Sequence, residues 1–234
     1  MLFVTYTSSY GGAERHLTDL LSRLDASAVE PVILCYGAEF YTERLTAAQH
    51  LWVRCVSRPR RTGLIGFLAY WREFITRRPD VVVFVNGFPR ALPWYAYLAA
   101  RAAGRGRIVS TEQLTGEPPP AAIAGPGLLN ACRRLLGWRS RYMVAPRLPG
   151  IVSDTTVCVS NAVRDRLVKD YQYPEEKTVT VWNGVDVERY GVATTRRAAV
   201  RRDLAIGSDE DVSVCVARLV FRSASTCCSM RWRA

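Results

Sequence analysis

Short apolar runs rich in Val, Ile and Cys alternate with segments of helical periodicity along most of the chain. Short strands separated by helices are typical of a parallel sheet that is covered on both faces. The sequence therefore predicts an α/β fold, a Rossmann-like doubly wound parallel sheet. The expected strands are residues 2–7, 31–36, 52–56, 81–86, 107–110, 155–160 and 179–182. The expected helices are about residues 13–24, 40–48, 64–77, 91–103, 127–142 and 161–171.

Composition narrows the class of protein. With 234 residues, of which 49% are hydrophobic, the chain can bury one sizeable core and begin a second. It has no apolar run of about 18 residues, and its start lacks the pattern of a signal peptide. The 7 cysteines form no C-x-x-C pair, and the 2 histidines, His16 and His50, are isolated. We expect a cytoplasmic protein without disulfides, metal or cofactor.

The net charge of +11 favours an anionic partner: nucleic acid, an acidic membrane surface or a phosphorylated substrate. The alternative is an arginine-rich composition that reflects a GC-rich genome. No RNP strand or zinc finger appears, so we do not expect nucleic acid. Two basic segments carry large apolar residues. We interpret residues 58–78 as an ordinary surface helix whose apolar stripe packs on the sheet. Residues 127–142 are the candidate for peripheral contact with the anionic inner face of the membrane, with an ordinary helix as the alternative.

Gly11 and Gly12 lie between the first expected strand and the first expected helix. Backbone N–H groups and the positive end of a helix can face an anion at such a turn. A glycine there lets a phosphate or a sugar approach the main chain. A tight turn without a ligand is the alternative. The spacing is not G-x-G-x-x-G, which argues against a nicotinamide or flavin enzyme.

Polar, glycine-containing segments follow the expected strands. In an open parallel sheet, ligands bind beyond the carboxyl ends of the strands, where the strand order reverses. The segments predict a cleft for sugars or phosphates at that edge. Each also has a turn-forming or capping explanation, since Ser160 and Asn161 suit the start of the following helix. The segments are residues 8–14, 37–40, 86–88, 111–113, 160–161 and 183–186.

Three stretches identify a family when they are taken in order. Residues 11–16 read GGAERH, residues 154–163 read DTTVCVSNAV, and residues 181–190 read VWNGVDVERY. Together they resemble the N-terminal half of a GT-B glycosyltransferase of family 4, a large group of retaining sugar transferases. The resemblance covers about residues 1–220. It implies an acceptor-binding Rossmann-like domain over residues 1–187, and an interdomain crossing with the first donor-domain strand over residues 188–220.

The resemblance also implies a chemistry. A nucleotide diphosphate sugar would be the co-substrate, and the acceptor would be a sugar, a lipid-linked molecule or a small molecule. The family generally needs no essential metal. The implied donor- and substrate-binding residues are Gly11, Gly12, Glu14, Asn86, Ser160, Asn183 and Arg218, and the implied catalytic residues are Glu112 and Gln113. The guanidinium fork of Arg218 suits a diphosphate.

The chain departs from the family pattern at three places. Many relatives have a histidine where Gln113 stands, and a neutral amide cannot exchange a proton near neutral pH. A lysine is usual at the position of Ser223. The glutamate pair of the donor domain would fall beyond residue 234.

Residues 221–234, FRSASTCCSMRWRA, have neither helical nor strand periodicity. We back-translated these residues into GC-rich codons and read the resulting bases in a frame shifted by two. The amino-acid sequence encoded in that frame has the pattern of the start of an amphipathic helix. We interpret these residues as an aberrant, disordered tail of a truncated, frameshifted gene product, with an authentic short C-terminus as the alternative. As written, the chain is then expected to transfer little or no sugar. The alternative function is a non-catalytic module that binds an acceptor or a membrane surface.

Overall fold

The computed structural model describes residues 1–5, 11–25, 27–35, 54–57, 63–87, 93–104, 106–114, 147–185, 187–188, 193–207 and 210–213. The chain divides into two units, residues 1–183 and residues 184–234, and each is described by itself. The first unit carries the sheet and all the site residues described below. In the second unit the described structure is mainly one helix, α9 (Ala193–Asp203). The domain functions implied by the family resemblance stay predictions.

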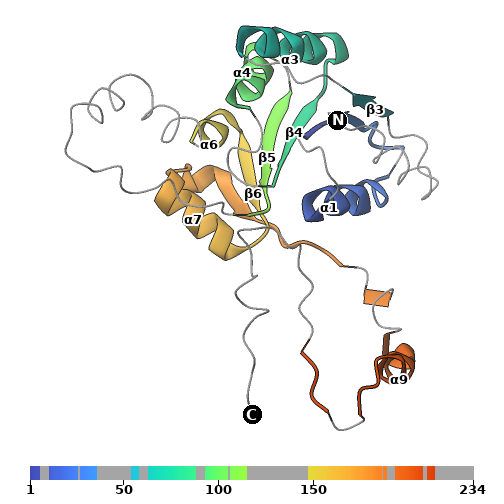
Figure 1. Cartoon of the computed structure of the whole chain (residues 1–234). Helices are drawn as coiled ribbons and strands as arrows, with labels where there is room; N and C mark the ends of the chain where they lie inside the picture. Colours follow the sequence, from blue (N-terminus) through green and yellow to red (C-terminus); the bar gives the residue numbers. More distant parts are fainter. Residues whose placement is uncertain are drawn as a thin grey trace. The chain divides into compact units, whose positions relative to one another are not determined.

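A parallel sheet of 7 strands forms the first unit (Figure 1). Its order is β3-β2-β1-β4-β5-β6-β7, and every neighbouring pair is parallel. The predicted Rossmann-like doubly wound sheet is therefore confirmed, with strand ends that differ by up to a few residues. The strands are β1 (Leu2–Thr5), β2 (Val32–Cys35), β3 (Arg54–Ser57), β4 (Val81–Asn86), β5 (Arg107–Glu112), β6 (Thr155–Cys158) and β7 (Thr178–Thr180).

Helices connect the strands of the first unit. The expected helices near residues 13–24, 64–77, 91–103 and 161–171 are confirmed, whereas those at 40–48 and 127–142 lie outside the described residues. The helices are α1 (Gly12–Leu21), α3 (Gly63–Arg77), α4 (Trp94–Ala102), α6 (Leu148–Val152) and α7 (Asn161–Tyr171), with a short 3-10 turn, η2 (Glu175–Lys177). The sequence did not predict α6 or α9. Five residues that include Pro149 and Gly150 carry no helical period, and α9 lacks an apolar stripe.

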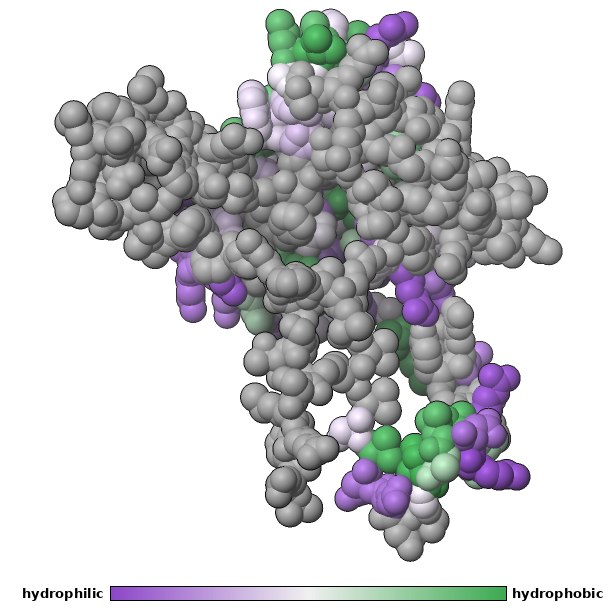
Figure 2. Space-filling model, in the orientation of Figure 1, coloured by the Kyte–Doolittle hydropathy of each residue, from purple (hydrophilic) through white to green (hydrophobic). Residues whose placement is uncertain are grey.

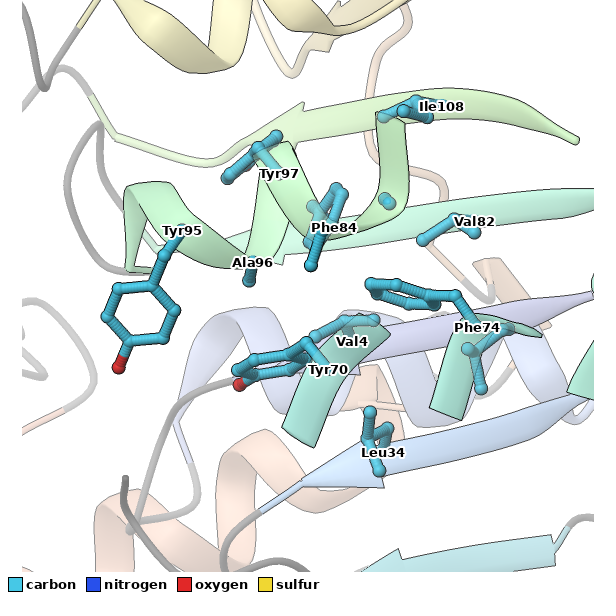
Figure 3. Packing of buried hydrophobic residues seen from close by; sticks show 13 residues of the cluster. Val4, Leu34, Tyr70, Phe74, Val82, Phe84, Tyr95, Ala96, Tyr97 and Ile108 are labelled. Carbon is cyan, nitrogen blue, oxygen red and sulfur yellow. The ribbon is translucent and has the colours of Figure 1, made fainter. Parts of the chain in front are cut away.

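Aromatic side chains fill the core between the sheet and helices α3 and α4 (Figure 3). Phe84 of β4 lies at the centre, stacked on Tyr97 of α4 with ring centroids 3.9 Å apart. Phe74 of α3 meets Phe84 edge-on. Because these rings interlock two helices with the middle of the sheet, α3 and α4 are held in fixed positions over this face.

The opposite face of the sheet has its own core, beneath α1 (Figure 1). Leu17 and Leu21 of α1 pack there against Phe3 and Val83, which alternate along their strands with residues of the first core. A sheet covered on both faces needs strands that are apolar at consecutive positions, which explains the run VVVFV in β4.

The strand order reverses between β1 and β4. From β1 the chain moves outward to β2, and from β4 it moves in the other direction to β5. The connections that follow β1 and β4 therefore diverge at their carboxyl ends, which is where open α/β sheets bind ligands. Gly12 begins the helix that follows β1, and Asn86 ends β4. Both residues thus belong to the edge where the sequence predicts a cleft.

Two glycines near the start of β5 allow the backbone conformation there to be tested by substitution. Gly104 and Gly106 both have positive φ, at 67° and 73°. A Cβ at Gly106 would lie 2.3 Å from the carbonyl oxygen of Pro79, whereas one at Gly104 would meet nothing within 4 Å. Gly104→Ala should lower the free energy of unfolding by about 1–2 kcal/mol because of the left-handed conformation alone. Gly106→Ala should lower it by at least about 3 kcal/mol, because backbone must move. Urea unfolding followed by circular dichroism measures both, and equal losses would contradict this view.

Candidate functional site

The last residues of β4 and β5 form the base of the candidate site. Asn86 and Glu112 end these two strands and lie opposite each other in the sheet register. Both are buried, with 1% and 0% of their surface exposed. The family resemblance implies that they face the acceptor or the reacting centre, but in this structure both side chains point into the protein interior. A role for either residue toward a substrate stays a prediction.

Asn86 is the centre of a buried hydrogen-bond network. Its Nδ2 donates to Oε1 of Glu112 at 2.7 Å, to Oη of Tyr97 at 2.6 Å and to Oγ of Ser110 at 3.0 Å. Ser110 Oγ donates to the same Oε1 of Glu112 at 3.0 Å. Three oxygen atoms lie within hydrogen-bond distance of this nitrogen and share its two N–H groups, which restricts the orientation of the Asn86 side chain at the carboxyl end of β4.

The buried carboxyl of Glu112 favours its neutral form. Burial raises the pKa of Glu112 to about 7, although the hydrogen bonds from Asn86 and Ser110 oppose that rise. Within the described residues, Oε2 of Glu112 and Oδ1 of Asn86 have no hydrogen-bond partner. Burial also raises the pKa of the Cys158 thiol to about 12, and the nearby Glu112 charge adds to that rise. A proton on Glu112 therefore removes a charge that would otherwise be buried beside the neutral Cys158 thiol.

Gln113 lies at the open side of this network. Its backbone N–H donates to the carbonyl oxygen of Asn86 at 3.2 Å, so the buried network fixes the Gln113 backbone. Its side chain is half-buried, and its Oε1 accepts a hydrogen bond from Nδ2 of the exposed Asn183 at 3.2 Å. Two residues that the sequence places in the site, 70 positions apart, are thus brought together.

The glycine turn opens α1. Gly11 has an extended backbone, with φ −139° and ψ −162°, so neither the turn nor the helix start requires its conformational freedom. Gly12 is exposed, and a Cβ added there would meet nothing within 4 Å in the described residues. The N–H groups of Gly12 and Ala13 have no acceptor within the helix. A small, open position beside outward N–H groups is what a ligand approaching the main chain needs.

Glu14 caps its own helix. Its Oε2 accepts a hydrogen bond from the backbone N–H of Gly11 at 2.8 Å, and its side chain is buried at 7% exposure. A carboxylate at the N-terminal end of α1 also interacts favourably with the helix dipole. Glu14 therefore stabilises the turn that presents Gly12. A direct contact of Glu14 with a donor stays a prediction.

Ser160 and Arg218 complete the predicted set. Ser160 is the N-cap of α7, where its Oγ accepts from the backbone N–H of Val163 at 3.2 Å. The capping role considered from the sequence is therefore present, and a substrate role stays a prediction. Arg218 lies outside the described residues. The sequence did not predict that Tyr97 and Ser110 belong to the site. Ser110 could have been found from its spacing of two residues from Glu112, which places both side chains on one face of β5.

The part of the chain that the structure describes has neither a candidate metal cluster nor a helix that could cross a membrane. No group of three or more His, Cys, Asp or Glu residues there could hold a metal ion. None of the described helices has the length and apolar character that crossing a bilayer requires. Partial burial lowers the pKa of His16, on the α1 side of the turn.

A family model and several solved structures are similar to the chain. The model described as Glycosyltransferase Family 4 matches residues 10–189. HepE from Anabaena, solved in complex with UDP, has a TM-score of 0.58 at 15% identity, over 87% of this chain and 49% of that one. A glycosyltransferase from Rickettsia africae has a TM-score of 0.58 at 18% identity, over 89% and 50% of the two chains.

A third structure has the same architecture. WaaG, a glycosyltransferase involved in lipopolysaccharide biosynthesis, has a TM-score of 0.52 at 14% identity, over 90% of this chain and 52% of that one. The chain spans about half the length of these structures. At such identities the likeness shows the fold. The comparison with curated protein sequences gave no match.

The pKa of Glu112 predicts how stability changes with pH. Because the folded pKa of about 7 exceeds the ordinary 4.5, folding favours the protonated carboxyl. Glu112 therefore contributes most to the free energy of unfolding below about pH 4.5. This contribution, roughly 3 kcal/mol, is lost as the pH rises through about 7. Glu112→Gln keeps the neutral shape and removes the titration. The free energy of unfolding of Glu112→Gln, minus that of the unmodified protein, should therefore rise between about pH 5 and pH 8.

The measurement is urea unfolding at several pH values, with Glu176→Gln on the exposed η2 turn as the control. The lowered pKa of His16 gives a pH dependence of opposite sign, but His16 is present in all three proteins and cancels in the comparison. A pH-independent difference between Glu112→Gln and the unmodified protein would contradict a titrating Glu112.

Proposed function

The chain belongs to glycosyltransferase family 4, and from this premise we propose that it forms the acceptor-binding half of a retaining, hexosyl-type glycosyltransferase. The complete enzyme would transfer a sugar from a nucleotide diphosphate sugar to an acceptor. The observation that carries this proposal is the hydrogen bond between Gln113 and Asn183 at the carboxyl edge of the sheet. It joins two of the six polar segments that predict a cleft at this edge, residues 111–113 and 183–186, and the first of them lies at the carboxyl end of β5, the strand next to β4, where the strand order reverses.

The donor would lie against the glycine turn. HepE was solved in complex with UDP and glucose, which supports a uridine diphosphate sugar as the donor to test first. The outward N–H groups of Gly12 and Ala13 suit the diphosphate, and the Glu14 cap keeps that turn in place. Arg218 would pair with the same diphosphate.

The acceptor would meet Gln113. This amide can orient a hydroxyl group through donated and accepted hydrogen bonds, but it cannot take up a proton near neutral pH. Asn86, Ser110, Tyr97 and Glu112 would act beneath it as positioning residues, because they fix the Asn86 carbonyl that holds the Gln113 backbone. The acceptor would be a sugar, a lipid-linked molecule or a small molecule.

The proposal includes the location of the protein in the cell and an alternative function. We propose a cytoplasmic enzyme that contacts the inner face of the membrane peripherally; residues 127–142, on which the sequence based that contact, lie outside the described residues. A non-catalytic module that binds an acceptor or a membrane surface is the alternative. Sugar transfer from UDP-glucose by the chain joined to a donor-binding half distinguishes the two, since a non-catalytic module would support no transfer.

Gly12→Val tests the donor role of the turn. The two added methyl groups would stand where the diphosphate approaches, so the Kd for UDP should rise at least about tenfold, while Gly12→Ala gives a smaller rise. Nothing described lies within 4 Å of the new Cβ, so thermal unfolding should barely change. Calorimetric titration of the chain joined to a donor-binding half of the same family measures the Kd. An unchanged Kd in Gly12→Val would remove the phosphate role from the turn.

Gln113→Ala tests the acceptor side. If Gln113 contacts the reacting sugar or the acceptor, the substitution should lower turnover more than donor affinity. Loss of one hydrogen bond aimed at developing charge typically costs about 2.7–4 kcal/mol, or roughly a hundred- to thousandfold in rate. Asn183→Ala, which removes the observed partner, should give a smaller loss, and the double variant should lose less than the sum. Wild-type turnover in Gln113→Ala would assign that residue to structure.

A further inference from the structure

Helix α3 has an apolar surface on the side that faces away from the sheet. Its inner side, with Gly66, Tyr70 and Phe74, is buried, which confirms the predicted packing of residues 58–78 for this stripe. On the outer side five large apolar residues are exposed. They are Leu64 at 72%, Ile65 at 60%, Leu68 at 49%, Trp71 at 36% and Ile75 at 36%. We call these five residues the outer face of α3.

The outer face is a continuous stripe. Leu64, Leu68, Trp71 and Ile75 are separated by four, three and four positions, so they stack along one side of the helix, with Ile65 beside them. Figure 2 shows hydrophobic surface over α3 at the top of the view, with hydrophilic surface next to it. Single exposed apolar side chains are common, but a contiguous stripe of five marks a surface that binds something apolar.

Positive charge borders the outer face. Arg72 is exposed on the helix next to the stripe, and Arg78 is exposed just past its end. The one acidic residue of α3, Glu73, is half-buried and paired with Arg77 at 2.8 Å. In the sequence, Arg58, Arg60 and Arg61 come shortly before the helix. An apolar stripe with Trp and bordering arginines, on a helix whose one carboxylate is paired, is complementary to lipid chains beneath anionic head groups.

We propose that the outer face of α3 docks on an anionic lipid bilayer, with the helix lying in the plane of the head groups. Leu64, Leu68 and Ile75 enter the acyl boundary, and Trp71 sits at the level of the head groups. Arg72 and Arg78 bind lipid phosphates. A second copy of the chain fits less well, because two such faces would bring the same arginines together without acidic partners. This inference rests on the peripheral membrane contact of the proposed function and adds α3 to it; it does not depend on the sugar-transfer chemistry.

The test is co-sedimentation of the 234-residue protein with vesicles. One set contains phosphatidylcholine alone, and the other contains equal amounts of phosphatidylcholine and phosphatidylglycerol. We expect binding to the anionic vesicles that weakens with added salt, and little binding to the neutral ones. Leu68→Ser with Trp71→Ser should weaken binding to anionic vesicles at least about tenfold. Arg72→Gln with Arg78→Gln should weaken it roughly fivefold for each arginine.

Matched controls use exposed residues on other elements. Leu20→Ser with Ile151→Ser removes two exposed apolar side chains outside α3, and Arg107→Gln with Lys169→Gln removes two exposed charges. Both controls should bind vesicles as the unmodified protein does, and circular dichroism should show the same fold for every variant. Equal binding to neutral vesicles, equal losses in the controls, or no binding at all would overturn the proposal. The proposal would also be overturned if the unmodified protein bound no lipid but sedimented as a dimer, and if the double variant Leu68→Ser, Trp71→Ser sedimented as a monomer.

Discussion

The burial of β4 on both faces is the constraint on which the rest of this structure depends. A strand covered by α1 on one side and by α3 and α4 on the other must be apolar at consecutive positions, as the run VVVFV is. A polar side chain on β4 then fits only at the end of the strand, where the helices no longer cover it. Asn86 occupies that end, at the reversal of strand order, and the neighbouring strand places Glu112 directly opposite. The site is therefore a consequence of how the sheet is covered.

Core and site share the side chain of Tyr97. Its ring stacks on Phe84 in the aromatic core, and its hydroxyl accepts a hydrogen bond from Asn86. A shift of α4 would therefore disturb both the packing of the sheet and the orientation of Asn86. Because the carbonyl oxygen of Asn86 also accepts from the Gln113 backbone, a chain of hydrogen bonds runs from Tyr97 in the core through Asn86 and Gln113 to the exposed Asn183. Preorganisation of this kind suits the role that we propose for Gln113, which is to orient an acceptor hydroxyl.

The protonation of Glu112 adds an electrostatic constraint to that network. A carboxyl that is entirely buried favours its neutral form, and the single Oε1 atom receives hydrogen bonds from both Asn86 and Ser110. Removing the proton would place a charge where Oε2 has no partner among the described residues. The network thus holds its geometry best when Glu112 is neutral. Its raised pKa lies close enough to neutral pH that solution conditions bear on the order of the site.

The sequence by itself determined the class of fold, since the alternation of apolar runs with helical periods depends only on local patterns that parallel sheets require. It also determined that Gly12, Asn86, Gln113 and Asn183 lie at the carboxyl edge, because every parallel strand ends there. Only the tertiary structure decided what each residue meets: that Glu112 points inward to Asn86, that Glu14 and Ser160 cap helices, and that Tyr97 joins core and site. It also decided which stripe of α3 is buried, since both sides of that helix are apolar in sequence. The reason is physical: a pattern fixes periodicity, but contacts between residues far apart in the chain depend on how the helices pack on the sheet.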